Sequence, residues 1–248
     1  MIKFILDLIN KIFKNTNKMK QEEIVTPVDL EIVYVLLDNG HGLETAGKCS
    51  PLWPNGQKLI EAEFSRDIVI RLFGSTSINK RVQLINVVPE TNDIELSTRS
   101  SRIAAYCKEY GVKNCFTISI HANGGGGTGW EVLARNSDMD KRYPKRAAEF
   151  SSESYVKTTK LSQEMAELAG QVAKSDLEDF KIRQEYANKL YKEQNVHILR
   201  EIPCPGILTE NLFMDTWKDC EFILSEDGRQ QIANLHVDII NRIVDKFF

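Results

Sequence analysis

Residues 32–38 read IVYVLLD and run directly into residues 39–42, NGHG. The first stretch is apolar at odd and even positions alike until it reaches Asp38. A short run of this kind is typical of a strand that is buried on both faces of a parallel sheet. We therefore expect a buried strand whose end lies next to His41.

The same pattern recurs along the chain, where apolar runs alternate with amphipathic helices. Five further runs are predicted to be strands: Val82–Val88, Cys115–His121, Gly129–Ala134, Val196–Leu199 and Gly206–Glu210. Four segments have helical periodicity: Phe64–Phe73, Ile94–Glu109, Lys157–Lys174 and Gln230–Phe247. The charged stretch 136–195 shows no strand signal, so we expect helix and loop there. Strands separated by helices predict the α/β class, with a mostly parallel sheet in a three-layer α/β/α domain over residues 30–248.

The composition is that of an ordinary folded protein. The 248 residues include 32 Lys and Arg against 35 Asp and Glu, which gives a net charge of −3. Without a long basic stretch, this balance argues against a dedicated nucleic-acid binder. No uninterrupted apolar run is long enough to span a membrane. The 5 cysteines form no CxxC pair and cannot all pair within one chain, so we interpret them as free thiols.

Residues 1–29 differ from the rest of the chain. Within residues 2–14, apolar side chains recur at helical spacing and lysines share the opposite face. Asp7 and Lys11 interrupt the apolar stretch that a secretory signal needs, so we expect no cleavable signal. Two interpretations stay open: a helix that contacts a membrane surface, and a helix that packs on the domain or on a partner. Residues 15–29 are polar and are predicted to be a linker.

Three of the expected strands end in residues that can carry chemistry. The first runs into His41, another ends at His121, and the last ends at Glu210. Ligands of parallel α/β sheets gather beyond the carboxyl ends of the strands, so these side chains are expected at one edge. Each also has an ordinary alternative when taken alone. His41 could be a turn residue bonded to Asp38, His121 a core histidine, and Glu210 a buried acid that caps the following helix.

A zinc hydrolase needs about three protein ligands and one open position for water. His41 and His121 would supply two, and either Glu61 or Glu63 could supply the third. Glu61 lies three residues before Phe64 and so shares the inward apolar stripe of the helix, whereas Glu63 faces outward. The spacing therefore favours Glu61.

Glu210 then remains as the catalytic carboxylate. Near an activated water, a carboxylate can take a proton and pass it to a leaving amine. We also expect Asp38 to orient His41 through a hydrogen bond, as groups behind metal ligands often do.

These residues belong to an ordered set of short motifs. The set comprises Asp-x-Gly-His-Gly at 38–42, Glu61 before an apolar helix, Ser-Ile-His-Ala-Asn at 119–123, Gly-x-Glu-Val at 129–132 and Thr-Glu-Asn at 209–211. In this order the chain resembles the zinc-dependent N-acetylmuramoyl-L-alanine amidases of the amidase-3 type. The resemblance extends from about Ile32 to Val244.

The resemblance implies a twisted sheet of six strands, flanked by helices, and one zinc ion. The metal ligands of the family fall on His41, Glu61 and His121, and its catalytic glutamate falls on Glu210. The implied reaction hydrolyses the amide between N-acetylmuramic acid and the L-alanine of the stem peptide, with peptidoglycan as the substrate. This sequence departs from the family at Asn39, where proline is usual, but keeps the four central residues.

Other functions stay open on the sequence alone. A zinc peptidase or deacetylase could use the same residues on another amide, and a silent module could bind the cell wall without cleaving it. We expect action at the cell wall or periplasm. A substrate outside the cytoplasm combined with no cleavable signal resembles a phage or prophage lysin, with a wall-remodelling enzyme as the alternative. The sequence leaves the oligomeric state open.

Overall fold

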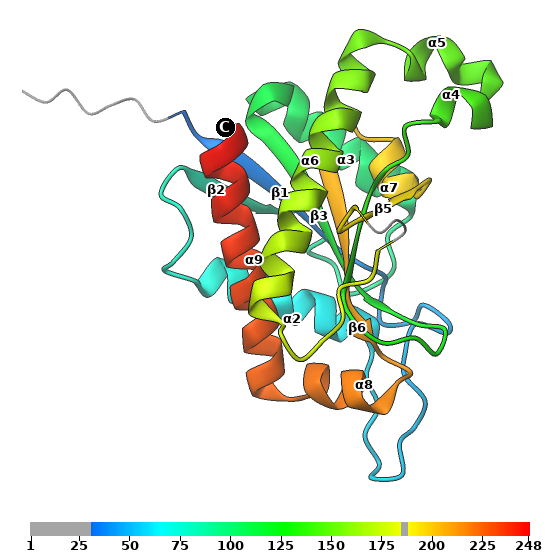
Figure 1. The fold of residues 1–248 in the computed structure, drawn as a ribbon, viewed down its shortest axis with the longest axis vertical. Helices are drawn as coiled ribbons and strands as arrows, with labels where there is room; N and C mark the ends of the chain where they lie inside the picture. Colours follow the sequence, from blue (N-terminus) through cyan, green and yellow to red (C-terminus); the bar gives the residue numbers. More distant parts are fainter. Residues whose placement is uncertain (1–30, 185–187) are drawn as a thin grey trace, which may run out of the picture. The chain divides into compact units, whose positions relative to one another are not determined.

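The computed structural model describes residues 31–184 and 188–248, and the strands of these ranges form one sheet. The strands are β1 (Val33–Asn39), β2 (Val82–Asn86), β3 (Cys115–Asn123), β4 (Glu131–Arg135), β5 (Lys192–Gln194) and β6 (Gly206–Phe213). Their order in the 6-stranded sheet is β2-β1-β3-β6-β4-β5 (Figure 1). Only β4 and β6 pair antiparallel, and the other neighbours are parallel. The expected mostly parallel sheet is confirmed.

Helices of the described ranges cover both faces of this sheet. The longer ones are α2 (Glu61–Gly74), α3 (Leu96–Tyr110), α6 (Glu153–Asp176), α8 (Trp217–Leu224) and α9 (Glu226–Phe247). The short ones are α4 (Met139–Arg142), α5 (Ala147–Phe150), α7 (His197–Arg200) and the 3-10 turns η1 (Val112–Asn114) and η2 (Pro144–Arg146). In Figure 1, α2, α6 and α9 lie over the near face. None of the helices in residues 31–184 and 188–248 has the length and apolar character of a membrane span.

The first strand shows why both faces are covered. Val33, Val35 and Leu37 are buried in the larger apolar cluster, together with residues of α2, α6 and α9. Leu36 points to the opposite face, where it joins a smaller cluster with residues of α3 and α7. Successive side chains of a strand alternate between faces, so a strand that is apolar throughout requires a layer of helices on each side. The three-layer architecture follows.

Two predictions are wrong in the segment that precedes β6. The stretch 196–199, predicted to be a strand, lies mostly in helix α7, and Ile198 and Leu199 are buried there. A short apolar run has no periodicity that would distinguish the two. Strand β5 lies within the stretch in which no strand was expected. It pairs with β4 at the edge of the sheet, where charged strands are common, and its Lys192 Nζ lies 2.6 Å from Glu131 Oε2.

The predicted N-terminal helix and linker, residues 1–29, lie outside the described residues. Residues 32–248 form one compact unit. The boundary at residue 30 and the contacts of residues 2–14 stay predictions.

Candidate metal centre and active site

The four predicted site residues come together at the carboxyl ends of β1, β3 and β6. These strands are neighbours in the sheet, and His121 of β3 is paired in register with Glu210 of β6. His41 follows β1 by two residues, and Glu61 is the first residue of α2. In Figure 1 these strand ends and the start of α2 lie in the lower half of the domain. Four separate elements therefore position one cluster.

Three of these residues are arranged as ligands of a single ion. One ligand atom from each of His41, Glu61 and His121 lies within 4.8 Å of the other two. Glu61 Oε1 is 3.5 Å from His41 Nε2 and 2.9 Å from His121 Nδ1. The side chain of Glu61 is only 1% exposed, and its Oε2 has no hydrogen-bond partner within the described residues. Ligands of a tetrahedral zinc ion lie roughly 3.4 Å apart, so this set of two imidazoles and a carboxylate fits zinc.

The protonation states of His41 and Glu61 also suit metal ligands. Burial lowers the pKa of His41 to about 4, although Glu61 partly opposes the shift. Burial alone would raise the pKa of Glu61, but the hydrogen bond with His121 and the nearby positive charges outweigh it and lower the pKa. At His121, burial alone would lower the pKa, but the hydrogen bond with Glu61 and the nearby carboxylates outweigh it and raise the pKa. At neutral pH His41 is neutral and Glu61 is ionised. These are the forms in which imidazole and carboxylate groups bind metals.

The backbone at His41 is held in an unusual conformation. His41 has a φ of 59°, in the left-handed region that non-glycine residues rarely occupy. Arg66 Nη2 donates a hydrogen bond to the His41 carbonyl at 2.9 Å, and Arg66 Nε donates to the Glu90 carbonyl at 3.0 Å. A Cβ at Gly40 would lie 2.3 Å from Cε1 of His121. The close approach of the His121 imidazole to the backbone at position 40 therefore requires glycine there.

Asp38 does not orient His41, so that prediction is wrong. The buried carboxylate of Asp38 accepts hydrogen bonds from Arg99 Nη1 at 3.0 Å and from Ser119 Oγ at 2.5 Å. Arg99 Nη1 also donates to the Asn39 carbonyl at 2.8 Å. Arginine is a multiple donor with a fixed fork, so it satisfies several groups at once. The pair of Asp38 and Arg99 fixes the end of β1 instead.

Glu210 lies beside this cluster with an unused oxygen. Its Oε2 is buried and has no hydrogen-bond partner within the part of the chain that the structure describes. Burial raises the pKa of Glu210 to about 7; the charge of His121 opposes the shift, and those of Glu61 and Glu131 add to it. A carboxyl group with a pKa near neutrality can both accept and donate a proton. Glu210 does not cap the following helix, because β6 continues to Phe213 and α8 begins after Thr216.

A cavity of about 340 Å³ opens next to the two histidines. Besides His41 and His121, it is lined by Asp93, Ile94, Glu95, Leu96 and Arg99. The loop 93–95 was not predicted to take part in the site. Its exposed polar residues before a helix carry no signal that distinguishes them from an ordinary surface loop.

Comparison with known proteins identifies the family. The sequence model of the amidase-3 family, described as N-acetylmuramoyl-L-alanine amidase, matches residues 35–242. The chain belongs to this family. Its activity is hydrolysis of the peptidoglycan amide between N-acetylmuramic acid and L-alanine. The peptidase, deacetylase and silent-module alternatives lose their support.

Two curated relatives support the assignment. The amidase is 28% identical over 214 residues to the N-acetylmuramoyl-L-alanine amidase CwlM of Bacillus licheniformis, covering 85% of this chain and 68% of that one. It is 27% identical over 208 residues to the sporulation-specific N-acetylmuramoyl-L-alanine amidase of Bacillus subtilis (strain 168), covering 84% and 66%. About a third of each relative therefore lies outside the match.

The fold of the amidase is also that of a solved structure. The crystal structure of N-acetylmuramoyl-L-alanine amidase from Clostridium difficile 630 superposes with a TM-score of 0.65 at 21% identity. The match covers 87% of this chain and 98% of the solved one. The two proteins thus share the fold.

Proposed function

We propose that the amidase holds one zinc ion with His41, Glu61 and His121, and that Glu210 carries the proton during hydrolysis. The observation that supports this most directly is the environment of Glu61. Its buried carboxylate lies between two imidazoles, and one of its oxygens has no hydrogen-bond partner in the described residues. Such a group is costly to bury unless a ligand completes its contacts. The match of residues 35–242 to the amidase-3 family, which includes all four residues, is consistent with it.

In the proposed reaction, the metal and the side chains of the protein have separate chemical roles. When bound, zinc supplies Lewis acidity to the scissile carbonyl and to water. Glu210 accepts a proton from the attacking water and passes it to the nitrogen of L-alanine as the carbon–nitrogen bond breaks. The products are the carboxylate of the lactyl group and a stem peptide with a free amino terminus. Arg66 holds the backbone of His41 through its hydrogen bond to the carbonyl, and Gly40 leaves room for the His121 imidazole.

Digestion of purified peptidoglycan tests this proposal. We expect the soluble products to be stem peptides that begin with a free L-alanine, as measured by mass spectrometry. A chelator should abolish their release, and added zinc should restore it. Glu210→Gln should retain zinc but lower the rate by about 10²- to 10⁴-fold, because only the proton carrier is lost. Chelator-resistant cleavage, or a near-normal rate for Glu210→Gln, would contradict the proposed roles.

We propose the cell wall as the place of action, because it contains the substrate. One matching relative is named as sporulation-specific. A phage or prophage lysin and a wall-remodelling enzyme are both compatible with the domain. Lysis from within by the expressed protein, with and without a membrane-permeabilising partner, separates the two.

A further inference from the structure

Lys48 lies on the loop between two of the proposed metal ligands. The backbone carbonyl of Lys48 accepts a hydrogen bond from the Glu61 amide at 3.0 Å, and Cys49 forms an isolated β-bridge with Ile60. These contacts hold the loop against the first turn of α2. The side chain of Lys48 therefore starts from a fixed point at the edge of the site.

The ammonium group of Lys48 has free hydrogen-bonding capacity. Its Nζ lies 3.9 Å from Glu61 Oε2, which is too far for a hydrogen bond, and the side chain is 41% exposed. Within residues 31–184 and 188–248 no hydrogen bond engages this group. Its charge nevertheless adds to the lowering of the pKa values of His41 and Glu61 and partly opposes the rise in the pKa of Glu210 that burial causes. The ammonium group thus lies close to the whole cluster.

The arginines around the site are already engaged by the fold. Arg66 donates to the carbonyls of Ala62, Glu90 and His41. Arg99 donates to two carbonyls and to the carboxylates of Asp38 and Asp93. The cavity next to the histidines also exposes the acidic side chains of Asp93 and Glu95. Of Arg66, Arg99 and Lys48, only Lys48 has a side chain that makes no hydrogen bond within the described residues, so its ammonium group is the one left to bind an acidic substrate group beside Glu61.

We propose that Lys48 binds the free α-carboxylate of the stem-peptide residue that follows L-alanine. This inference rests on the proposed function. That residue is joined to its successor through its side-chain carboxyl group, so its α-carboxyl group is free, or is a carboxamide where the stem is amidated. An ammonium group forms charge-assisted hydrogen bonds with a carboxylate that a neutral carboxamide cannot match. Lys48 would make the enzyme prefer unamidated stems.

The test uses the zinc-loaded protein of residues 1–248 and two soluble muramyl peptides. The two peptides are identical except for a carboxylate or a carboxamide at the second residue. kcat and KM are measured for the wild type, Lys48→Met and Lys48→Arg, with Lys58→Met as the control. Lys58 is an exposed lysine on the same loop and makes no hydrogen bond or ion pair in the described ranges. Zinc affinity is measured for every variant.

We expect Lys48→Met to raise KM for the carboxylate peptide about tenfold and to leave the carboxamide peptide almost unchanged. Lys48→Arg should retain most of the preference, and Lys58→Met all of it. Zinc affinity should stay the same or rise, because a neighbouring positive charge is removed.

Other results would overturn the proposal. An equal loss of kcat on both peptides would place Lys48 at the reacting carbonyl. An unchanged preference in Lys48→Met would leave the lysine as a counter-charge for Glu61. Either result leaves the proposed function intact if the wild type cleaves the peptides in a chelator-sensitive way. Absence of chelator-sensitive cleavage in the wild type would overturn both proposals together.

Discussion

Two polar clusters are buried against the same pair of strands, β3 and β6, and they differ in how completely they are hydrogen-bonded. The front cluster, at the carboxyl ends of the strands, consists of His41, Glu61, His121 and Glu210. The back cluster, beneath helix α9, consists of Trp130, Thr209, Asn211 and His236. Glu210 lies between Thr209 and Asn211 in the chain, so the two clusters are built from adjacent residues.

The back cluster is fully hydrogen-bonded. Nδ1 of His236 donates to the Ile232 carbonyl at 2.8 Å, so its Nε2 is the acceptor that receives the Thr209 hydroxyl at 2.9 Å. Asn211 Nδ2 donates to the His121 carbonyl, and Trp130 Nε1 donates to Asn211 Oδ1, each at 2.9 Å. Every polar side-chain group in this cluster has a partner.

The front cluster, in contrast, has two buried oxygens that lack a hydrogen-bond partner within the described residues, Oε2 of Glu61 and Oε2 of Glu210. Each such group costs about 1 to 3 kcal/mol of stability. This difference is the one expected if the back cluster supports the fold and the front cluster binds the proposed metal and substrate. We therefore expect substitutions in the front cluster to reduce activity with little loss of stability. Substitutions in the back cluster should reduce stability with little loss of activity.

The largest expected effect comes from Glu61. Glu61→Gln should lose zinc and reduce activity by more than about a hundredfold, the loss typical of a group that only supports a ligand. Its melting temperature without metal should not fall, because a buried charge is removed. Zinc content, peptidoglycan digestion and thermal melts measure the three quantities.

Glu63→Gln is the matched control, since Glu63 lies two residues away in α2 and is exposed. It should retain zinc and activity. If Glu63→Gln lost the metal and Glu61→Gln kept it, the assignment from the helix face would be wrong.

The next effect concerns acid stability and comes from the back cluster. Burial lowers the pKa of His236 to about 4, from 6.5 in an unfolded chain. Between these values the unfolded state binds a proton that the folded state does not. The free energy of unfolding should therefore fall by about 3 kcal/mol as the pH drops from 6.5 to 4, and no further below that.

Other groups also titrate in this range, so the measurement compares the wild type with His236→Gln. Urea unfolding in the presence of a chelator removes any contribution from the metal. The wild type should lose more stability than the variant between pH 7 and pH 4. Parallel pH profiles for the two proteins would show that His236 is not held neutral.

The smallest expected effect comes from Thr209. Thr209→Val removes the hydroxyl that His236 Nε2 accepts, and should lower the free energy of unfolding by about 1 to 3 kcal/mol. Thr98→Val, at an exposed position of α3, should change it by less than about 0.5 kcal/mol. The rate of hydrolysis by Thr209→Val should stay within a few-fold of the wild type. A large loss of activity at unchanged stability would contradict the separation of the two clusters.

The sequence predicts correctly those features of the fold and of the site that depend on a single local pattern. The strand after Glu31 was predicted because both of its faces are apolar, and the structure brings Glu61 rather than Glu63 to the two histidines, as the helix periodicity indicated. The strand ends then placed Glu210 beside them.

The sequence was uninformative where contacts from distant parts of the chain decide. Strand β5 has no residues typical of strands, and it forms because its backbone pairs with β4. Asp38 contacts Arg99, which lies 61 positions later in the chain, rather than His41. The charge of Lys48 close to Glu61 depends on a loop whose path the sequence does not reveal. Local patterns carry no information on such pairings.

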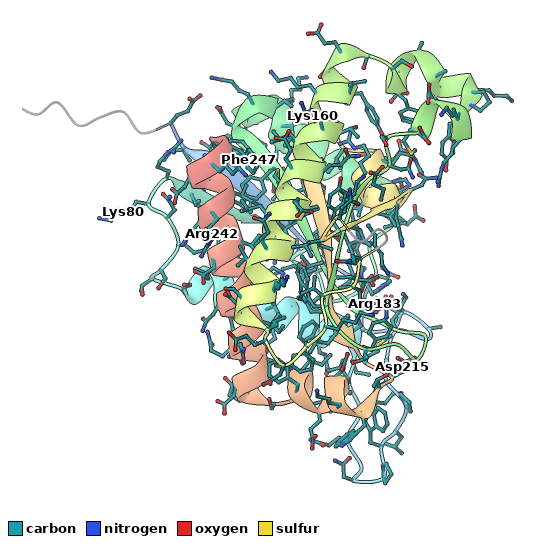
Figure 2. The ribbon with its side chains drawn as sticks, in the orientation of Figure 1. Lys80, Lys160, Arg183, Asp215, Arg242 and Phe247 are labelled. Atoms are coloured by element: carbon teal, nitrogen blue, oxygen red, sulfur yellow. The ribbon has the colours of Figure 1, made fainter. Side chains whose placement is uncertain are left out.

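The parallel direction of β1 and β3 has a practical consequence for handling the protein. Phe248, the last residue of the chain, packs on Phe116 near the start of β3, and its carbonyl accepts a hydrogen bond from Arg81 Nη2. Figure 2 accordingly shows Phe247 far from Asp215, which follows the carboxyl end of β6. A support, label or fused carrier attached through the carboxyl terminus would leave the reactive edge turned outward. Immobilised enzyme could then reach an insoluble polymer.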